Sequence, residues 1–201
     1  MKRISGNIVD VTRAEIYPGT LVISGGKIAD IIREETDDDT YLMPGFVDAH
    51  VHIESTMLTP AEFSRIATIH GTIATVSDPH EIANVLGIEG VRYMIEDARR
   101  APLKICFSAP SCVPATPFET AGASLGVREV KELLALGEVG YLGEVMNFPG
   151  VIDGDPEIME KICSAAACSK PVDGHAPGLR GDDLERYARA GISTNHECLS
   201  A

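Results

Sequence analysis

The residues best suited to chemistry in this sequence are His50 and His52, which end a short apolar segment that follows a Pro-Gly turn. On a β-strand, side chains at positions i and i+2 point to the same face, so the two imidazoles project side by side. Two neutral imidazoles held together make half of a site for a divalent metal. The alternative is an edge strand with two exposed histidines, but the preceding turn and the following Glu54 favour a metal site.

Acidic and metal-ligating side chains recur after other apolar segments. They are Asp78-Pro79-His80-Glu81, Glu144, His175 and His196-Glu197. A carboxylate can bridge two metal ions, and such a pair lowers the pKa of bound water so that a nucleophile forms at neutral pH. One histidine or glutamate alone is more often structural, but their succession indicates a binuclear centre. The remaining histidine, His70, precedes Gly71 at a predicted helix end, where capping or the helix dipole explains it.

From residue 44 onward, segments with strand character alternate with helical patterns. We predict strands over 45–52, 72–77, 104–109, 140–146, 170–175 and 191–196, with helices opening near residues 60, 87, 127, 156 and 182. Such alternation is typical of parallel βα units. The chemistry-bearing residues stand at the carboxyl ends of these strands, where a (β/α)8 barrel keeps its active site. The predicted fold class is α/β, an incomplete (β/α)8 TIM-type barrel of about six units.

Residues 1–43 have a different pattern, with short strands over 6–11, 20–23 and 27–32 and a hairpin turn over 24–27. A β module of this size is too small to be stable alone, so we expect it to pack against another part of the protein. Residues 44–201 form the barrel portion. A closed barrel needs two further units, so we expect the chain to be the N-terminal part of a longer protein.

Composition argues against several functional classes. The net charge of −13 disfavours a nucleic-acid or membrane partner, because phosphate binding needs clustered Lys and Arg. The five cysteines include no C-x-x-C pair, so neither a disulfide framework nor a thiolate zinc site is predicted. We expect a cytoplasmic location, because there is no apolar signal-peptide region and no apolar run approaches the roughly 20 residues that span a bilayer.

Longer motifs carry a family resemblance. They are PGFVDAHVHIESTM (44–57), VSDPHEIANV (76–85), PSCVPATPFET (110–120), GEVMNFPGV (143–151), DGHAPGL (173–179) and NHEC (195–198). The order H-x-H, carboxylate, His, His resembles the amidohydrolase superfamily. The longer runs are more specific, and they resemble the adenine deaminases within it over essentially the whole chain.

The resemblance implies a metal-dependent hydrolase that converts adenine to hypoxanthine and ammonia in purine salvage, by attack of a metal-bound hydroxide at C6. It implies a (β/α)8 barrel with a small β-sandwich domain built from both chain termini, to which residues 1–43 would belong. By motif position, His50 and His52 would bind one metal, His175 and His196 the other, and Glu144 would bridge them. Manganese is the expected metal, and iron or zinc also suits these ligands. The superfamily's aspartate on the eighth strand lies beyond residue 201, so we expect this chain to be inactive or nearly so.

Further candidate residues surround this ligand set. Catalytic roles are predicted for Glu144, His80 and Glu197, and substrate-binding roles for Asp78, Glu81, Glu54 and Ser111. For the segment 78–81, a purine-binding role and a simple helix cap at Asp78-Pro79 both stay open. Residues 110–120 form a Pro-rich loop with Ser111, Thr116 and Glu119 that suits a pocket wall or a plain connection. Cys112 and Cys198 are interpreted as small buried residues rather than nucleophiles.

Two alternatives remain beside adenine deamination. One is another amidohydrolase acting on a cyclic amide or a different aminopurine, since the ligand set alone cannot separate these substrates. The other is a non-catalytic fragment that needs a partner chain. The expected partner of the leading hypothesis is a small-molecule substrate, adenine, and a homo-oligomer is left open.

Overall fold

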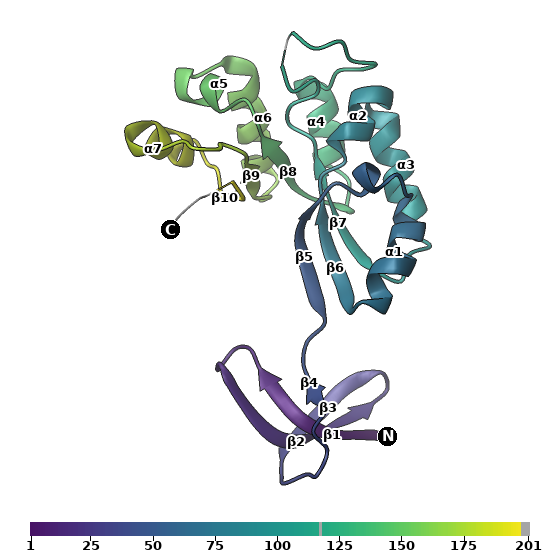
Figure 1. Ribbon diagram of the computed structural model, residues 1–201. Helices are drawn as coiled ribbons and strands as arrows, with labels where there is room; N and C mark the ends of the chain where they lie inside the picture. Colours follow the sequence, from purple (N-terminus) through teal and green to yellow (C-terminus); the bar gives the residue numbers. More distant parts are fainter. Residues whose placement is uncertain (117, 198–201) are drawn as a thin grey trace. The chain divides into compact units, whose positions relative to one another are not determined.

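The computed structural model describes residues 1–116 and 118–197. The chain divides into two compact units, Met1–Gly45 and Phe46–Ala201. The first unit is a small sheet and the second is a curled parallel sheet covered by helices (Figure 1).

The first unit is a four-stranded sheet in the order β3-β2-β1-β4. Its strands are β1 (Lys2–Asp10), β2 (Glu15–Ser24), β3 (Lys27–Arg33) and β4 (Tyr41–Leu42). Gly25 and Gly26 join β2 to β3 with φ of 59° and 75°, as a two-residue type I′ hairpin requires. β1 begins earlier than predicted, because its exposed first residues carry no apolar alternation but still pair with the end of β2. That this sheet belongs to a β-sandwich stays a prediction.

The second unit is built on six strands that pair in parallel in sequence order. They are β5 (Phe46–Val51), β6 (Thr72–Ser77), β7 (Lys104–Ala109), β8 (Val139–Val145), β9 (Val172–Gly174) and β10 (Thr194–Asn195). This confirms the predicted fold class and the six strands. The last two strands are shorter than predicted, because Pro171 has no N–H to donate and β10 pairs with one neighbour only among the described strands.

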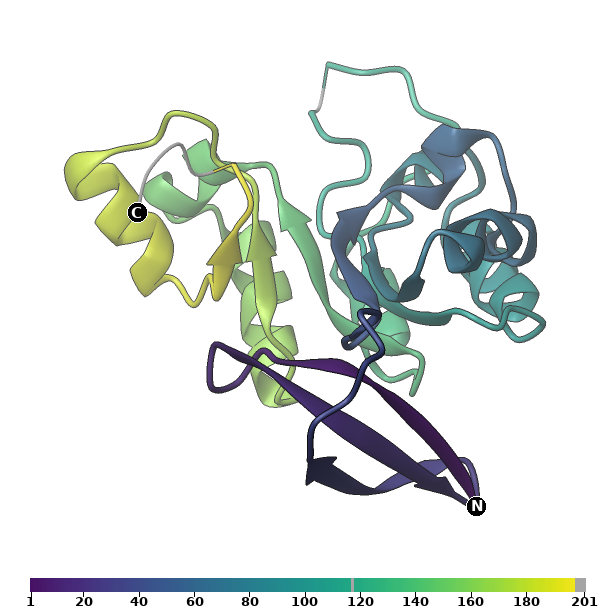
Figure 2. The same cartoon turned by 60° about the horizontal axis from the view of Figure 1, so that its bottom comes forward.

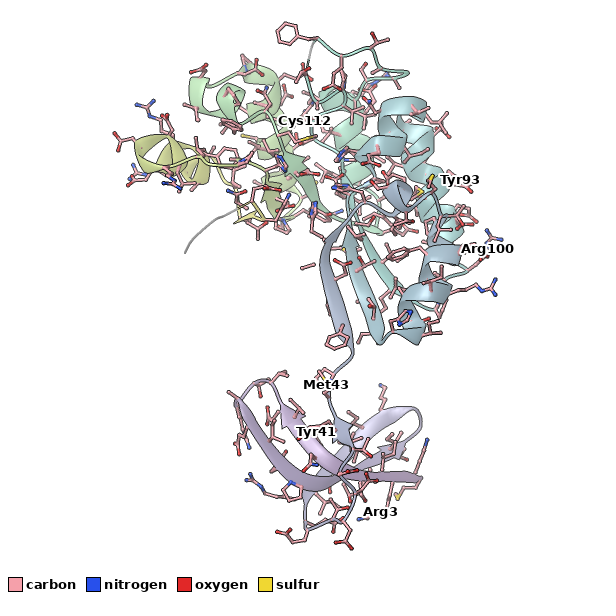
Figure 3. All side chains as sticks on the ribbon, viewed as in Figure 1. Arg3, Tyr41, Met43, Tyr93, Arg100 and Cys112 are labelled. Carbon is pink, nitrogen blue, oxygen red and sulfur yellow. The ribbon has the colours of Figure 1, made fainter. Side chains whose placement is uncertain are left out.

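Helices follow the strands and lie on the outer side of the curled sheet (Figure 2). They are the short 3-10 helix η1 (Ile53–Thr56), α1 (Pro60–Ile69), α2 (His80–Leu86), α3 (Ile88–Ala98), α4 (Val127–Leu134), α5 (Phe148–Asp153), α6 (Pro156–Ala167) and α7 (Gly181–Arg189). Tyr93 on α3 and Arg100 after it point away from the sheet (Figure 3). The helix α5 was not predicted. It is only six residues long and is started by the Asn147 side chain, which accepts a hydrogen bond from Gly150 N.

The apolar core lies between the strands and these helices, with Phe107, Leu133, Leu142 and Val145 almost fully buried. β8 is buried on both faces, as expected for an inner strand of a parallel sheet. No helix among the described residues is both long and apolar enough to cross a membrane.

Candidate metal centre

The carboxyl ends of five strands converge on one point because the sheet curls. β5 and β10 are at opposite ends of the strand order, so on a flat sheet about five strand spacings, or ~24 Å, would separate them. Nevertheless the rings of His50 on β5 and His196 after β10 stack with centroids 3.8 Å apart. The β5–β6 ladder is irregular between Asp48 and Val51, the segment that carries His50. Such irregularities re-aim side chains next to functional sites.

The centre of this convergence is the carboxylate of Glu144, at the end of β8, whose side chain is 3% exposed. Oε1 lies 3.1 Å from His52 Nε2, 3.2 Å from His80 Nδ1 and 3.7 Å from His50 Nε2. Oε2 lies 2.7 Å from His175 Nδ1 and 3.2 Å from His196 Nε2. Each carboxylate oxygen therefore faces its own group of imidazole nitrogens.

The tautomers of two histidines follow from their outer contacts. His52 Nδ1 is 2.8 Å from the carbonyl oxygen of Asp78, which can only accept a hydrogen bond. His196 Nδ1 is 3.2 Å from the carboxylate oxygen Oδ2 of Asp173, another acceptor. With the proton on Nδ1 in both rings, the lone pair of each neutral ring is on Nε2, which faces Glu144. Metal-ligating histidines are held in this way in proteins.

The backbone of Glu144 is fixed by buried polar residues. Its N–H donates to Asp78 Oδ2 at 2.9 Å, and its carbonyl accepts from Ser111 Oγ at 2.7 Å. Asp78 Oδ1 in turn accepts from Ser108 Oγ at 2.7 Å. A Cβ on the neighbouring Gly143 would lie 2.5 Å from Asp78 Oδ2, so only glycine allows this carboxylate to approach β8.

Asp78 and Ser111, two predicted substrate-binding residues, thus make their side-chain hydrogen bonds within the protein. Both are 1% exposed. The other two lie together nearby: Glu54 Oε1 accepts from the backbone N–H of Glu81 and of Ile82 at 3.1 and 3.2 Å, which caps the start of α2. The helix cap considered for Asp78-Pro79 is therefore supplied by Glu54, and the Asp78 side chain makes no cap bond. The Glu81 carboxylate accepts from Ser55 Oγ.

The charges at the centre are strongly coupled. Burial favours the neutral form of Glu144, but hydrogen bonds from His52 and His80 outweigh it and hold the pKa of Glu144 well below its usual range. The hydrogen bond to Glu144 is the main cause that raises the pKa of His52 to about 9. Burial lowers the pKa of His80, but Asp78 and Glu144 together raise it to about 10. Without a metal, the carboxylates hold protons on these rings.

The donor set fits divalent cations. Three groups of residues each bring their donor atoms within 4.8 Å of one another. They are His50-Glu144-His196, His52-His80-Glu144 and His175-His196-Glu197. Two of them share the Glu144 carboxylate, which gives a bridging ligand between two positions. Nitrogen and carboxylate ligands without cysteine suit Mn²⁺, Fe²⁺ or Zn²⁺. The structure brings the five expected ligands together and adds His80, for which the sequence predicted a catalytic role.

A cavity of about 220 Å³ opens beside the centre. It is lined by His80, Glu81, Asn84, Cys112, Ala115 and Glu119. His80 belongs both to this lining and to the Glu144 cluster, so the cavity adjoins the candidate metal centre. Asn84 Oδ1 is buried without a hydrogen-bond partner and is available to a ligand. Glu119 and Thr116, on the loop after β7, hydrogen-bond to each other at 3.3 Å, whereas Pro117 and Cys198 lie outside the described residues.

Three polar residues that support the centre, of which Tyr187 and Lys161 are buried and Asp173 is half-buried, were missed from the sequence. Asp173 contacts His196 and His50. The Tyr187 hydroxyl donates to Val145 O at 2.8 Å and accepts from His175 N at 3.0 Å. Lys161 Nζ, 5% exposed as a residue, donates to the carbonyls of Ser111 and Leu125. Only Asp173 had a usable signal, because it stands two residues before His175 on a strand and shares its face.

Solved structures share this fold. N-acetyl-D-glucosamine-6-phosphate deacetylase from Mycobacterium smegmatis matches 97% of this chain and 55% of its own, with a TM-score of 0.65 and 16% identity. N-isopropylammelide isopropylaminohydrolase from Burkholderia multivorans matches 94% of this chain and 56% of its own, with a TM-score of 0.51 and 18% identity. At these identities the likeness concerns the fold alone.

Curated relatives are much more similar in sequence. Proteins named adenine deaminase from Sulfurovum sp. and Salinibacter ruber are 57% and 58% identical over 98% of this chain, and one from Methanosarcina mazei is 53% identical over 99%. The chain spans 36–37% of the length of these relatives. The model of the Amidohydrolase family matches residues 41–201, which include every strand of the curled sheet and all the residues gathered around Glu144. This chain belongs to the amidohydrolase family.

Proposed function

We propose that the centre around Glu144 binds two divalent cations and serves the hydrolytic deamination of adenine to hypoxanthine and ammonia. The observation that carries the proposal is the division of the Glu144 carboxylate between two groups of histidines, with Oε1 facing His52 and Oε2 facing His175. The identity of the substrate is supported by the relatives named adenine deaminase. Mn²⁺ is the proposed metal, with Fe²⁺ and Zn²⁺ as the alternatives that the ligand set allows.

The two cations, when bound, supply Lewis-acid chemistry that activates water at neutral pH. His50 and His52 would hold one cation, His175 and His196 the other, and Glu144 would contact both. In the reaction, one water is consumed, a bond from its oxygen to C6 of adenine forms, and the bond between C6 and the amino nitrogen breaks. The amino group leaves as ammonia after it gains a proton.

His80 is placed to hold or move a proton in this reaction. Its Nδ1 lies 3.2 Å from Glu144 Oε1 and 3.6 Å from Asp78 Oδ2, while its side chain also lines the adjoining cavity. A cavity of about 220 Å³ is smaller than the roughly 300 Å³ at which drug-sized pockets begin, which suits a single small base. Asn84 and Glu119 on its walls offer hydrogen-bonding groups to the ring edge of such a base. Glu197 joins His175 and His196 in a donor group and is a second proton carrier.

The test is ammonia release by the purified, metal-loaded full-length protein from adenine, guanine and cytosine, together with ring opening of dihydroorotate and metal content. We expect adenine to have the highest kcat/KM. The variant Glu144→Gln should lose both bound metal and activity, whereas His70→Ala, on an exposed histidine at the end of α1, should keep both. A preference for another substrate, or a protein that binds neither metal nor adenine, would overturn the proposal.

A further inference from the structure

Asp173, at the middle of β9, is positioned between two histidines that come from opposite ends of the sheet. Its Oδ2 lies 3.2 Å from His196 Nδ1 and 3.5 Å from His50 Nδ1. Its Oδ1 accepts hydrogen bonds from Thr194 Oγ1 at 2.6 Å and from Gly174 N at 3.0 Å. With Oδ1 anchored, Oδ2 has a fixed direction toward the two imidazoles. The Asp173 side chain is 13% exposed, so water competes weakly for these contacts.

The ring planes of the two imidazoles are nearly parallel. Their rings stack with an interplanar angle of 23°, and both present Nε2 toward Glu144. His50 Nδ1 is buried and makes no hydrogen bond of good geometry, and its nearest carboxylate oxygen is Asp173 Oδ2. One oxygen thus faces the Nδ1 atoms of both rings. For His196 this places the ring proton on the side away from Glu144, and for His50 the same carboxylate oxygen is the acceptor that Nδ1 faces.

We propose that Asp173 is a positioning residue for the metal centre, which holds His50 and His196 as neutral Nδ1-protonated ligands with Nε2 directed at the two cations. This inference rests on the proposed function. A carboxylate behind a metal-ligating histidine fixes the ring and raises its basicity, and losing such a partner typically weakens metal binding 10- to 100-fold. His50 and His196 belong to different metals in the proposed ligand set, so Asp173 couples the two positions.

The same role is performed differently at His52. There the Nδ1 acceptor is the backbone carbonyl of Asp78, which no side-chain substitution removes. His175 needs no such acceptor at Nδ1, because that nitrogen itself faces Glu144 at 2.7 Å. Asp173 is therefore the side chain on which the orientation of two of the four histidine ligands depends. Its loss should weaken binding at one or both metal positions and should leave His52 and His175 in place.

The test is titration of the metal-free protein with Co²⁺, followed by visible absorption, and with Mn²⁺, followed by electron paramagnetic resonance. We expect Asp173→Asn to weaken binding of at least one ion 10- to 100-fold and to change the Co²⁺ spectrum, while the circular dichroism spectrum stays that of the parent. Asp182→Asn, the same substitution on an exposed residue at the start of α7, is the matched control and should bind as the parent does.

A second variant keeps the inference testable if Asp173→Asn fails to fold. Thr194→Val removes the hydroxyl that anchors Asp173 Oδ1 and should weaken metal binding in the same direction by a smaller factor. Parent-like affinity for both ions in a folded Asp173→Asn protein, or in Thr194→Val when only that variant folds, would overturn the inference. A parent protein that binds no metal would instead overturn the proposed function, so the two failures are distinguishable.

Discussion

The clearest stability prediction concerns the hydroxyl of Tyr187 on α7. The residue is 1% exposed, and its hydroxyl donates to the carbonyl of Val145 and accepts from the backbone N–H of His175. The Val145 carbonyl lies at the carboxyl end of β8, directly after Glu144. The His175 N–H lies at the carboxyl end of β9 and belongs to a candidate metal ligand. Burial raises the pKa of Tyr187, so the hydroxyl keeps its proton and can make both bonds. Tyr187→Phe removes the oxygen atom and preserves the ring.

The magnitude follows from the two bonds. Each contributes about 1 kcal/mol net, and a buried group left without its partner costs about 1–3 kcal/mol. Val145 is fully buried, so its carbonyl loses its partner without replacement by water. The His175 side chain is 30% exposed, which lets water reach this segment more easily. We therefore expect Tyr187→Phe to lower the free energy of unfolding by about 2–3 kcal/mol.

The assay is equilibrium unfolding in urea, followed by circular dichroism on the metal-free protein. Tyr93→Phe on α3 is the matched control, because Tyr93 is 51% exposed and water replaces whatever its hydroxyl loses (Figure 3). We expect the control to change the stability by less than about 0.5 kcal/mol. The reasoning would be refuted if Tyr187→Phe also changed it by less than that amount, with an unchanged dependence on urea.

Three further predictions address the surroundings of Glu144. Gly143→Ala should displace Asp78 and abolish tight metal binding in a metal titration, whereas Gly137→Ala, with no atom within 4 Å of the added Cβ, should not; equal affinities would contradict this. Lys161→Met should destabilise the protein by about 2–4 kcal/mol in urea unfolding, because two buried carbonyls lose their donor, while the exposed Lys131→Met should change little. In the metal-free protein, the raised pKa values of His52 and His80 contribute to the free energy of unfolding. This contribution is fully present below pH 6.5 and is lost as the pH rises through about 9 to 10. Urea unfolding at several pH values checks this, and a free energy of unfolding that increases over this range would contradict the assignment.

Much of the fold could be predicted because local patterns carry it. Apolar runs bounded by Gly and Pro marked the six strands, and helical spacing marked α3, α4 and α6, which begin within one residue of the predicted positions. The failures are local and physical. Helix α5 has six residues, too few for the spacing of apolar residues to reveal a helix. The helix predicted to open near residue 87 is α3, and the seven-residue helix α2 before it was given no range. Boundaries in β9 and β10 depend on pairing with neighbours and not on the apolar runs.

The convergence of ligands could be predicted from parallel strands, whose carboxyl ends meet on one side of a barrel. The partners of those ligands could not, because they depend on how far the sheet curls. Asp173 on β9 contacts His50 on β5 only because the sheet curls far enough to bring these two non-adjacent strands together. Nothing local in either segment specifies that distance. Lys161 similarly reaches Ser111 from a helix fifty residues further along the chain.

His80 shows where residue type stops being informative. By residue type and place, His80 is one more histidine after a strand, and only the family resemblance gave it a catalytic role where His52 and His175 were expected to bind metal. The structure distinguishes it, because its Nδ1 lies between the carboxylates of Asp78 and Glu144 and its side chain also lines the adjoining cavity. One nitrogen of His80 faces both carboxylates, which favours a proton on that nitrogen, and a protonated nitrogen cannot bind a metal. The geometry thus favours a proton-carrying role for His80 beside the cations, and the four remaining histidines with Glu144 are sufficient to hold two of them.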